Sequence, residues 1–165
     1  MNIKPVLVLA ALSTLGACAS YTEITTPPVT PKIKHASVNE RVLGFSDFDL
    51  RTVDAKDSQK EIVGATCTLD SAELSARVTT PARIHMPQLK GKPTALKIAC
   101  TAGTSKGALS LEPHLTGTAV GGPSAAGLVA AIVTSAIVAS QDKWSYGGGA
   151  GIPALVKMTG PEAAK

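Results

Sequence analysis

The chain has 165 residues, of which 16 are basic and 12 are acidic, so its net charge is only +4. This length suits a single domain. The basic residues are scattered along the sequence, and only 3% of the residues are aromatic. Nucleic-acid-binding proteins concentrate positive charge and use aromatic side chains to stack on bases, so we expect no nucleic-acid partner.

Residues 1–17 have the order of features typical of an export signal. Lys4 provides a positive start, and an apolar run follows from Pro5 to Leu15, as in the hydrophobic region of a secretory signal peptide. The run ends in Leu15-Gly16-Ala17-Cys18, which resembles the lipobox of bacterial lipoproteins. The resemblance implies cleavage before Cys18, a diacylglyceryl thioether on its sulfur and an acylated amino terminus. We expect no cofactor other than this covalent lipid.

The residues after Cys18 indicate a location. Ala19 and Ser20 follow it, whereas many proteobacterial lipoproteins that stay in the inner membrane have Asp at the second position. The lipoprotein family therefore implies the outer membrane, with the acyl chains in the lipid bilayer and the protein facing the periplasm. In the alternative, an ordinary signal peptide is cut near Ala17 or Ala19, and Cys18 has no special role.

Residues 18–37 are expected to form an extended tether that begins at the lipidated cysteine. They are rich in Thr and Pro, and Pro27, Pro28 and Pro31 favour a polyproline-like backbone that rises about 3.1 Å per residue. Such a tether would hold the next domain at most roughly 45 Å from the lipid surface.

Residues 38–114 predict a β-domain. In residues 63–69 and 96–100, apolar side chains occupy every second position and include Cys67 and Cys100, so both cysteines point toward a buried face. With Cys18 used for lipid, these two form one pair in the oxidising compartment that an exported protein reaches. We therefore predict a Cys67–Cys100 disulfide in a mainly β fold, a small antiparallel β-sandwich or curled sheet.

The same region carries a family resemblance. Cys67, a Thr-Thr-Pro-Ala segment at 79–82, alternating Ile84 and Met86, and Leu-x-Ile-x-Cys at 96–100 are similar to a β-domain of small proteobacterial lipoproteins. The region from Val63 to Leu111 also resembles the PEGA-type surface β-domains. The resemblance brings no catalytic residues, so it implies a non-catalytic periplasmic domain.

Residues 115–143 predict one long apolar helix, rich in Ala and Gly, toward the C-terminus. No charged side chain occurs from Leu115 to Gln141. Small residues recur at four-residue spacing, which lets a helix approach a neighbour closely; this stripe is Gly127, Ala131, Ser135 and Ala139. Either the helix packs on the sheet, or it enters a membrane or an oligomer contact. Residues 144–165 are expected to form a Gly-rich loop and a C-terminal tail.

We expect no catalytic site and no metal site. The segment from Gly103 to Gly107 matches G-x-S-x-G, but the alternating runs on both sides predict a hairpin and not the strand–helix turn of a nucleophile elbow. No histidine has a second ligand at short spacing, and Asp47 and Asp49 fit polar positions on an edge strand.

The expected function is a structural or interaction module of the cell envelope without catalysis. The alternative is an oligomerising or membrane-inserting component of an envelope or secretion assembly, acting through residues 115–141. The partners would then be an envelope protein or a second copy of the chain.

Overall fold

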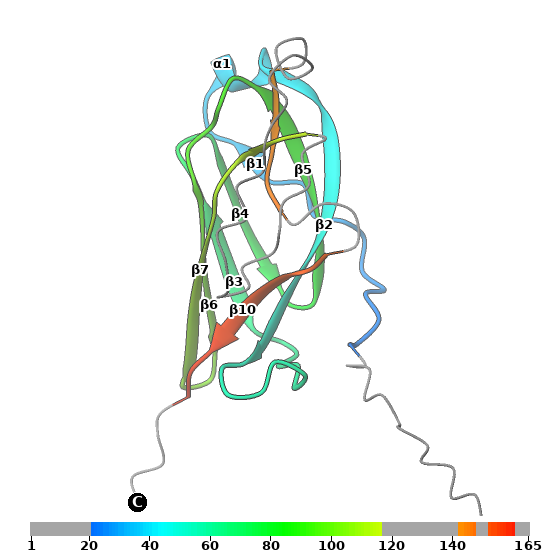
Figure 1. Cartoon of the computed structure of the whole chain (residues 1–165), viewed down its shortest axis with the longest axis vertical. Coiled ribbons are helices and arrows are strands. Elements are labelled where there is room, and N and C mark those ends of the chain that lie inside the picture. The colour runs from blue at the N-terminus through cyan, green and yellow to red at the C-terminus, as the bar shows by residue number, and fades with distance from the viewer. Residues whose placement is uncertain (1–20, 117–141, 148–151, 161–165) are drawn as a thin grey trace, which may run out of the picture.

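The described part of the chain is mainly β. The computed structural model describes residues 21–116, 142–147 and 152–160 (Figure 1). The strands are β1 (Lys32–Ile33), β2 (Val42–Asp54), β3 (Thr66–Asp70), β4 (Leu74–Thr79), β5 (Ala82–Lys90), β6 (Leu96–Ala102), β7 (Ser105–Leu111), β8 (His114–Leu115), β9 (Lys143–Ser145) and β10 (Ala154–Met158). A short helix, α1 (Ala36–Asn39), precedes β2. The prediction of a mainly β fold is confirmed.

The strands form two five-stranded sheets that enclose one core. Their orders are β1-β4-β3-β6-β7 and β10-β2-β5-β9-β8. β10 runs parallel to β2, and the other pairs between these strands are antiparallel. The two sheets face each other (Figure 1), and side chains that alternate inward from both sheets form the core between them. The largest fully buried core side chains are Leu50, Leu69, Leu74, Ile84, Met86, Leu96, Ile98 and Met158.

The two core cysteines lie at opposite positions on neighbouring strands. Cys67 of β3 pairs with Cys100 of β6 in the antiparallel register, and their sulfurs are bonded. Strand β6 alternates strictly, so that Leu96, Ile98 and Cys100 all point into the core. The predicted disulfide is confirmed, and its sulfurs lie on the buried face that the alternation indicates.

The long apolar helix predicted for residues 115–143 is wrong. Leu115 belongs to β8 and Lys143 to β9, and these two strands pair with each other. Within the described ranges, no helix is longer than the four residues of α1. The prediction extended the helix to both ends of an uncharged run, but Leu115 lies opposite Trp144 in a strand pair, and no local pattern specifies such a pairing. Residues 117–141, with the stripe Gly127, Ala131, Ser135 and Ala139, lie outside the described residues.

The domain begins earlier in the chain than the predicted boundary at residue 38. Val29 forms a parallel bridge with Ile84, in which the Val29 N–H donates to the Arg83 carbonyl at 2.8 Å and the His85 N–H donates to the Val29 carbonyl at 2.9 Å. Strand β1 then pairs with β4. The predicted tether is therefore built into the domain from Val29 onward, as extended backbone through β1 and then as the first residues of α1.

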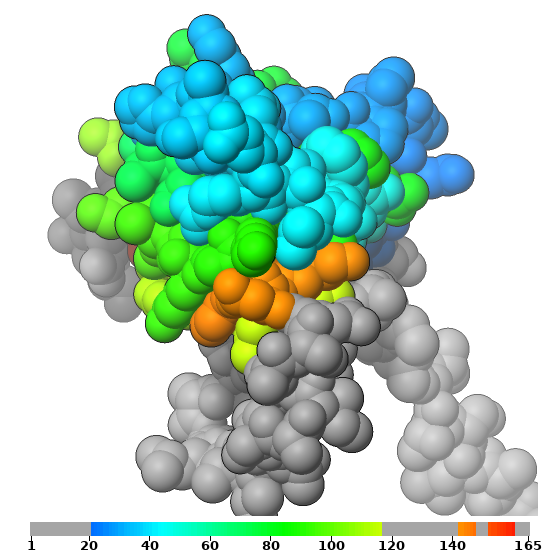
Figure 2. Space-filling view, turned by 90° about the horizontal axis from the view of Figure 1, so that it is seen from above, coloured from blue at the N-terminus to red at the C-terminus, as the bar shows by residue number. Residues whose placement is uncertain are grey.

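The molecule is elongated, with α1 at one end and the β2–β3 loop at the other (Figure 1). At the α1 end, the Arg41 side chain donates to the Lys90 carbonyl at 2.8 Å, and Lys90 pairs with Lys143 of β9. Residues around α1 and the start of β2 accordingly lie near β9 in the view from this end (Figure 2). At the opposite end, Thr66 pairs with Thr101, which brings the β2–β3 loop close to the turn between β6 and β7.

Strands β7 and β10 join the two sheets along one side. Lys106 and Thr159 exchange two backbone hydrogen bonds, with N···O distances of 3.0 and 2.8 Å. Here the strands approach so closely that a Cβ atom on Gly107 would lie 2.5 Å from the Lys157 carbonyl oxygen and 2.8 Å from Met158 Sδ. A glycine is therefore required where β7 crosses β10.

Replacing Gly107 tests this close approach. Gly107→Ala is expected to lower the free energy of unfolding by about 1–3 kcal/mol, because the added methyl group pushes β7 away from β10. Ala108→Val changes the next residue, whose side chain is exposed, and should alter stability by less than about 0.5 kcal/mol. Urea denaturation measures both values. Equal losses in the two variants would contradict the constraint.

Removing the disulfide tests its contribution to stability. The double variant Cys67→Ala, Cys100→Ala opens a link between positions 33 residues apart. In the loop-entropy description, the expected loss in unfolding free energy is about 3–4 kcal/mol. Urea denaturation of the oxidised chain and of the double variant gives the difference, with Thr68→Ala on the exposed face of β3 as the control. A double variant as stable as this control would contradict the expectation.

Candidate functional site

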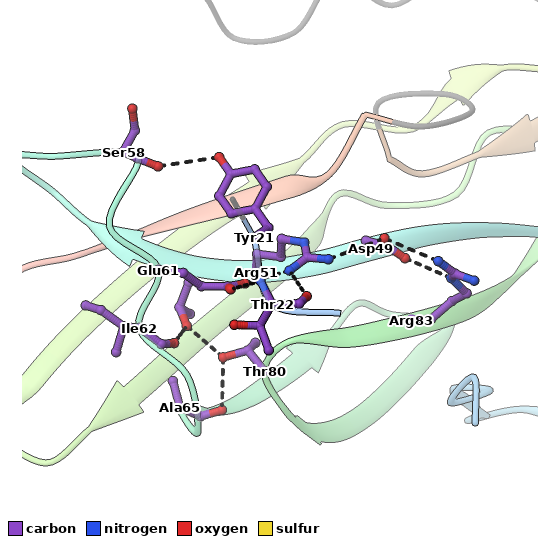
Figure 3. A network of polar contacts seen from close by, with 11 residues as sticks. Tyr21, Thr22, Asp49, Arg51, Ser58, Glu61, Ile62, Ala65, Thr80 and Arg83 are labelled. Carbon is purple, nitrogen blue, oxygen red and sulfur yellow. Dashed lines mark hydrogen bonds and ion pairs between the residues drawn. The ribbon is translucent and has the colours of Figure 1, made fainter. Parts of the chain in front are cut away.

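Arg51 lies in a buried stretch of β2 and is the centre of a polar network. Its neighbours Leu50 and Thr52 are fully buried, and its own side chain is only 9% exposed. A buried charge is costly unless it is paired and hydrogen-bonded. Arg51 Nη1 donates to Glu61 Oε1 at 2.7 Å and to the Thr22 carbonyl oxygen at 2.8 Å (Figure 3). The charge is therefore satisfied by the β2–β3 loop and by the N-terminal segment together.

The same contacts hold the N-terminal segment on the domain. The Thr22 N–H donates to Glu61 Oε2 at 2.7 Å, so both backbone polar groups of Thr22 are bound by the ion pair. The Tyr21 ring lies 5.1 Å from Arg51 Cζ in a cation–π contact, and its hydroxyl group donates to the Ser58 carbonyl at 3.4 Å. We name this set the N-terminal clamp: Tyr21, Thr22, Arg51, Ser58 and Glu61 (Figure 3).

The partners of Glu61 keep it ionised. Burial raises the pKa of its carboxyl group, but the hydrogen bonds from the Thr22 backbone and from Arg51 outweigh burial, and the pKa is lowered overall. A carboxylate with a lower pKa in the folded chain stabilises the fold above its unfolded pKa. That stabilisation is lost as the pH falls through the folded pKa. The clamp is therefore charged at neutral pH and weakens in acid.

Two threonines fix the loop that carries Glu61. Thr52 Oγ1 donates to the Ile62 carbonyl at 2.5 Å and shares a 2.6 Å hydrogen bond with Thr80 Oγ1. The Thr80 N–H donates to the Ala65 carbonyl at 2.9 Å. The last part of the β2–β3 loop is thus tied to β2 and to the end of β4, which places Glu61 beside Arg51 (Figure 3).

A row of charged side chains continues from the clamp along the outward face of β2 and β5. Asp49 accepts hydrogen bonds from Arg83 at 2.9 and 3.4 Å, and its Oδ2 lies 3.8 Å from Arg51 Nη2 (Figure 3). Asp47 lies opposite His85, with 2.6 Å between Oδ1 and Nδ1. We name Asp47, Asp49, Arg83 and His85 the outer row.

Charge pairing across two strands accounts for the geometry of the outer row. His85 stacks on Phe45 at a centroid distance of 4.6 Å and bonds to Asp47. A catalytic triad also requires a nucleophile hydrogen-bonded to the second ring nitrogen, and the described residues show no such bond to His85. Asp47 and Asp49 each have a basic partner, so they do not converge as the paired carboxylates of acid–base chemistry.

The chain matches no family model, and neither a curated protein nor a solved structure is significantly similar to it. The clamp and the outer row are therefore interpreted from their own geometry. Over the described ranges, no group of three metal-ligating side chains occurs. In the same ranges, no helix is long and apolar enough to cross a bilayer.

The structure places some of the residues singled out in the sequence. Cys67 and Cys100 are joined inside the core. The G-x-S-x-G segment from Gly103 to Gly107 spans the turn from β6 into β7, as predicted for a hairpin. The predicted lipidation site, Cys18, lies outside the described residues.

Sequence reasoning missed the N-terminal clamp. A signal is present, because Arg51 lies within the one continuous buried stretch of β2, between Leu50 and the pair Thr52 and Val53. A cation in such a run requires an anionic partner. The choice of Glu61 among 12 acidic residues depends on where the β2–β3 loop returns, and no local pattern specifies this.

Replacing Glu61 tests the charge of the clamp. Glu61→Gln is expected to lower the unfolding free energy at pH 7 by about 1.5–3 kcal/mol, because Arg51 loses an ionised hydrogen-bond partner. The difference from the unaltered chain should shrink toward pH 3, because the falling pH protonates Glu61 first in the unfolded chain and then, as it passes the lowered pKa, in the folded chain. Urea denaturation at both pH values measures this. Glu40→Gln, at an exposed position, is the control, and identical pH dependence in the two variants would contradict the expectation.

Proposed function

We propose that this chain is a lipid-anchored protein of the bacterial outer membrane, whose β-domain faces the periplasm as a non-catalytic structural or interaction module. One observation carries the proposal. Of the three cysteines, Cys18 is the one outside the Cys67–Cys100 disulfide, and it ends the apolar stretch as Leu15-Gly16-Ala17-Cys18.

The disulfide supports export. Disulfides persist in oxidising compartments such as the bacterial periplasm and are rare where thiols are kept reduced. Cys67 and Cys100 are almost completely buried at the centre of a sheet, so the fold includes the cross-link as part of its core. This agrees with residues 1–17 acting as an export signal.

The anchor would supply the membrane affinity of the protein. Burial of acyl chains contributes about 0.8 kcal/mol per CH₂ group, and two or more chains hold a protein stably where one does not. A thioether-linked diacylglyceryl group with an acylated amino terminus meets this requirement. The β-domain would then be free to use its surface for contacts with an envelope partner.

Replacing Cys18 tests the proposal. In the unaltered chain, mass spectrometry of the N-terminal fragment should show a lipid-modified Cys18 without residues 1–17, and the protein should fractionate with the outer membrane. In Cys18→Ala, no lipid should be attached. Ser20→Ala, which keeps the Leu15–Cys18 motif, is the control and should retain the lipid. An unmodified Cys18 in the soluble fraction of the unaltered chain would overturn the proposal.

A second variant separates the anchor from the segment 115–141. In it, residues 1–17 are replaced by the leader of a soluble exported protein and Cys18 by Ala, so the chain is exported without lipid. We expect this variant in the soluble periplasmic fraction. Retention in the membrane fraction would instead support a membrane or assembly role for residues 115–141.

A further inference from the structure

We propose that the domain rests with its β2–β3 end directly against the lipid headgroups of the membrane that holds it, and that the N-terminal clamp fixes this orientation. The inference rests on the lipid anchor at Cys18 proposed above. We name this region the anchor end and define it by Tyr21, Thr22, the β2–β3 loop (residues 55–65) and the β6–β7 turn (residues 103–104).

The clamp makes the connection to the anchor short. Only Ala19 and Ser20 separate Cys18 from Tyr21, and three Cα-to-Cα steps span at most about 11 Å. Tyr21 is held by Arg51 and Ser58, so the β2–β3 loop must stay close to the lipid. Without the clamp, the next backbone bridge to a sheet is at Val29, and 11 steps could reach about 40 Å.

Burial of the ion pair shields the clamp from salt. The side chains of Arg51 and Glu61 are 9% and 6% exposed, so they are weakly screened by salt compared with surface pairs. The Thr22 N–H donates to Glu61 and the Thr22 carbonyl accepts from Arg51, so both backbone polar groups of Thr22 bind this pair. A segment held only by exposed contacts would exchange readily with solvent, whereas this one is bound through desolvated charges.

The anchor end has side chains that suit a headgroup surface. Val63 in its loop is 58% exposed, an apolar side chain open to solvent. Besides the mutually paired Arg51 and Glu61, the charged side chains at and next to this end are Lys56, Lys60, Lys106, Lys157, Glu23, Asp54 and Asp57. Four lysines against three carboxylates give only a weak attraction to anionic lipid. The position of the domain is therefore set by the covalent anchor and the clamp, and charge has a minor part.

This orientation turns the α1 end away from the membrane. Arg51 lies nine positions after Val42 along β2, a rise of about 30 Å at the usual spacing of a strand. Leu43 and Phe45, each 47% exposed, lie toward that far end. The surface available to a periplasmic partner is then the one farthest from the lipid.

Fluorescence transfer to the bilayer tests the orientation. The full lipidated chain is placed in vesicles of phosphatidylethanolamine and phosphatidylglycerol that contain acceptor-labelled lipid. A donor is attached at Ser58→Cys or at Asn39→Cys, both exposed positions; the native cysteines are blocked by the disulfide and by lipid. We expect the donor at position 39 to lie about 30 Å farther from the membrane surface than the donor at position 58.

Two variants open the clamp in different ways. Arg51→Ala removes the ion pair. Thr22→Pro removes only the N–H that donates to Glu61 and leaves the buried pair intact. The second variant therefore tests the clamp even if Arg51→Ala does not fold. In both, the donor at position 58 should move away from the membrane by up to about 30 Å. Arg83→Ala is the matched control, because it breaks an exposed pair on the same sheet and leaves Tyr21 and Thr22 untouched.

The outcomes separate this inference from the proposed function. Mass spectrometry establishes lipidation of each variant first, and a chain without lipid overturns the proposed function. Equal distances at positions 39 and 58 in the lipidated chain would overturn the orientation alone. A folded Thr22→Pro variant with the same distances as Arg83→Ala would overturn the role of the clamp.

Discussion

A guanidinium group among buried strand residues needs an anionic partner beside it. The Arg51 side chain therefore determines where the neighbouring segments must lie. Glu61 supplies the charge and Thr22 the carbonyl oxygen, so the β2–β3 loop and the N-terminal segment both have their positions set by one side chain. Desolvation offsets much of the Coulomb attraction in such a pair. What the pair provides is therefore mainly specificity, because any arrangement that removes one partner leaves a buried charge unmatched.

The loop that carries Glu61 leads into β3, and the disulfide fixes the register of that strand. Cys67 and Cys100 face each other across β3 and β6, and a slip by one residue would turn every core side chain of β3 outward. Ala65, two residues before Cys67, receives the hydrogen bond from Thr80 that ends the β2–β3 loop. The start of β3 is thus held on both sides. The disulfide holds it from the core, and the polar contacts of the clamp hold the loop that precedes it.

The parts of this fold that could be predicted are those in which a local pattern specifies the structure. Alternation around Cys67 and Cys100 was sufficient for the strands and for the disulfide. The helix predicted from 115 to 143 was wrong at both ends, because Leu115 and Trp144 pair as strands, and no local pattern specifies a pairing between positions so far apart in the sequence. Prolines around Val29 predict extended backbone, yet only a distant strand, at Ile84, decides whether that backbone lies in solvent or on a sheet. Glu61, the partner of Arg51, could not be predicted for the same reason, because the contact depends on where a distant part of the chain lies.

The sheet edges restrict how this domain can meet other molecules. Strands β7 and β10 are joined through Lys106 and Thr159, and the remaining edge strands, β1 and β8, have two residues each in the described structure. Strand addition by a partner needs a longer row of backbone groups than β1 and β8 offer over the described ranges. Side chains on the outward faces of the sheets are another means of contact. On β2 the half-exposed apolar ones lie toward the α1 end, where Phe45 is held in place by stacking on His85. Because an ordered ring loses little side-chain entropy when it is covered, the end of the domain opposite the clamp is the better prepared for recognition.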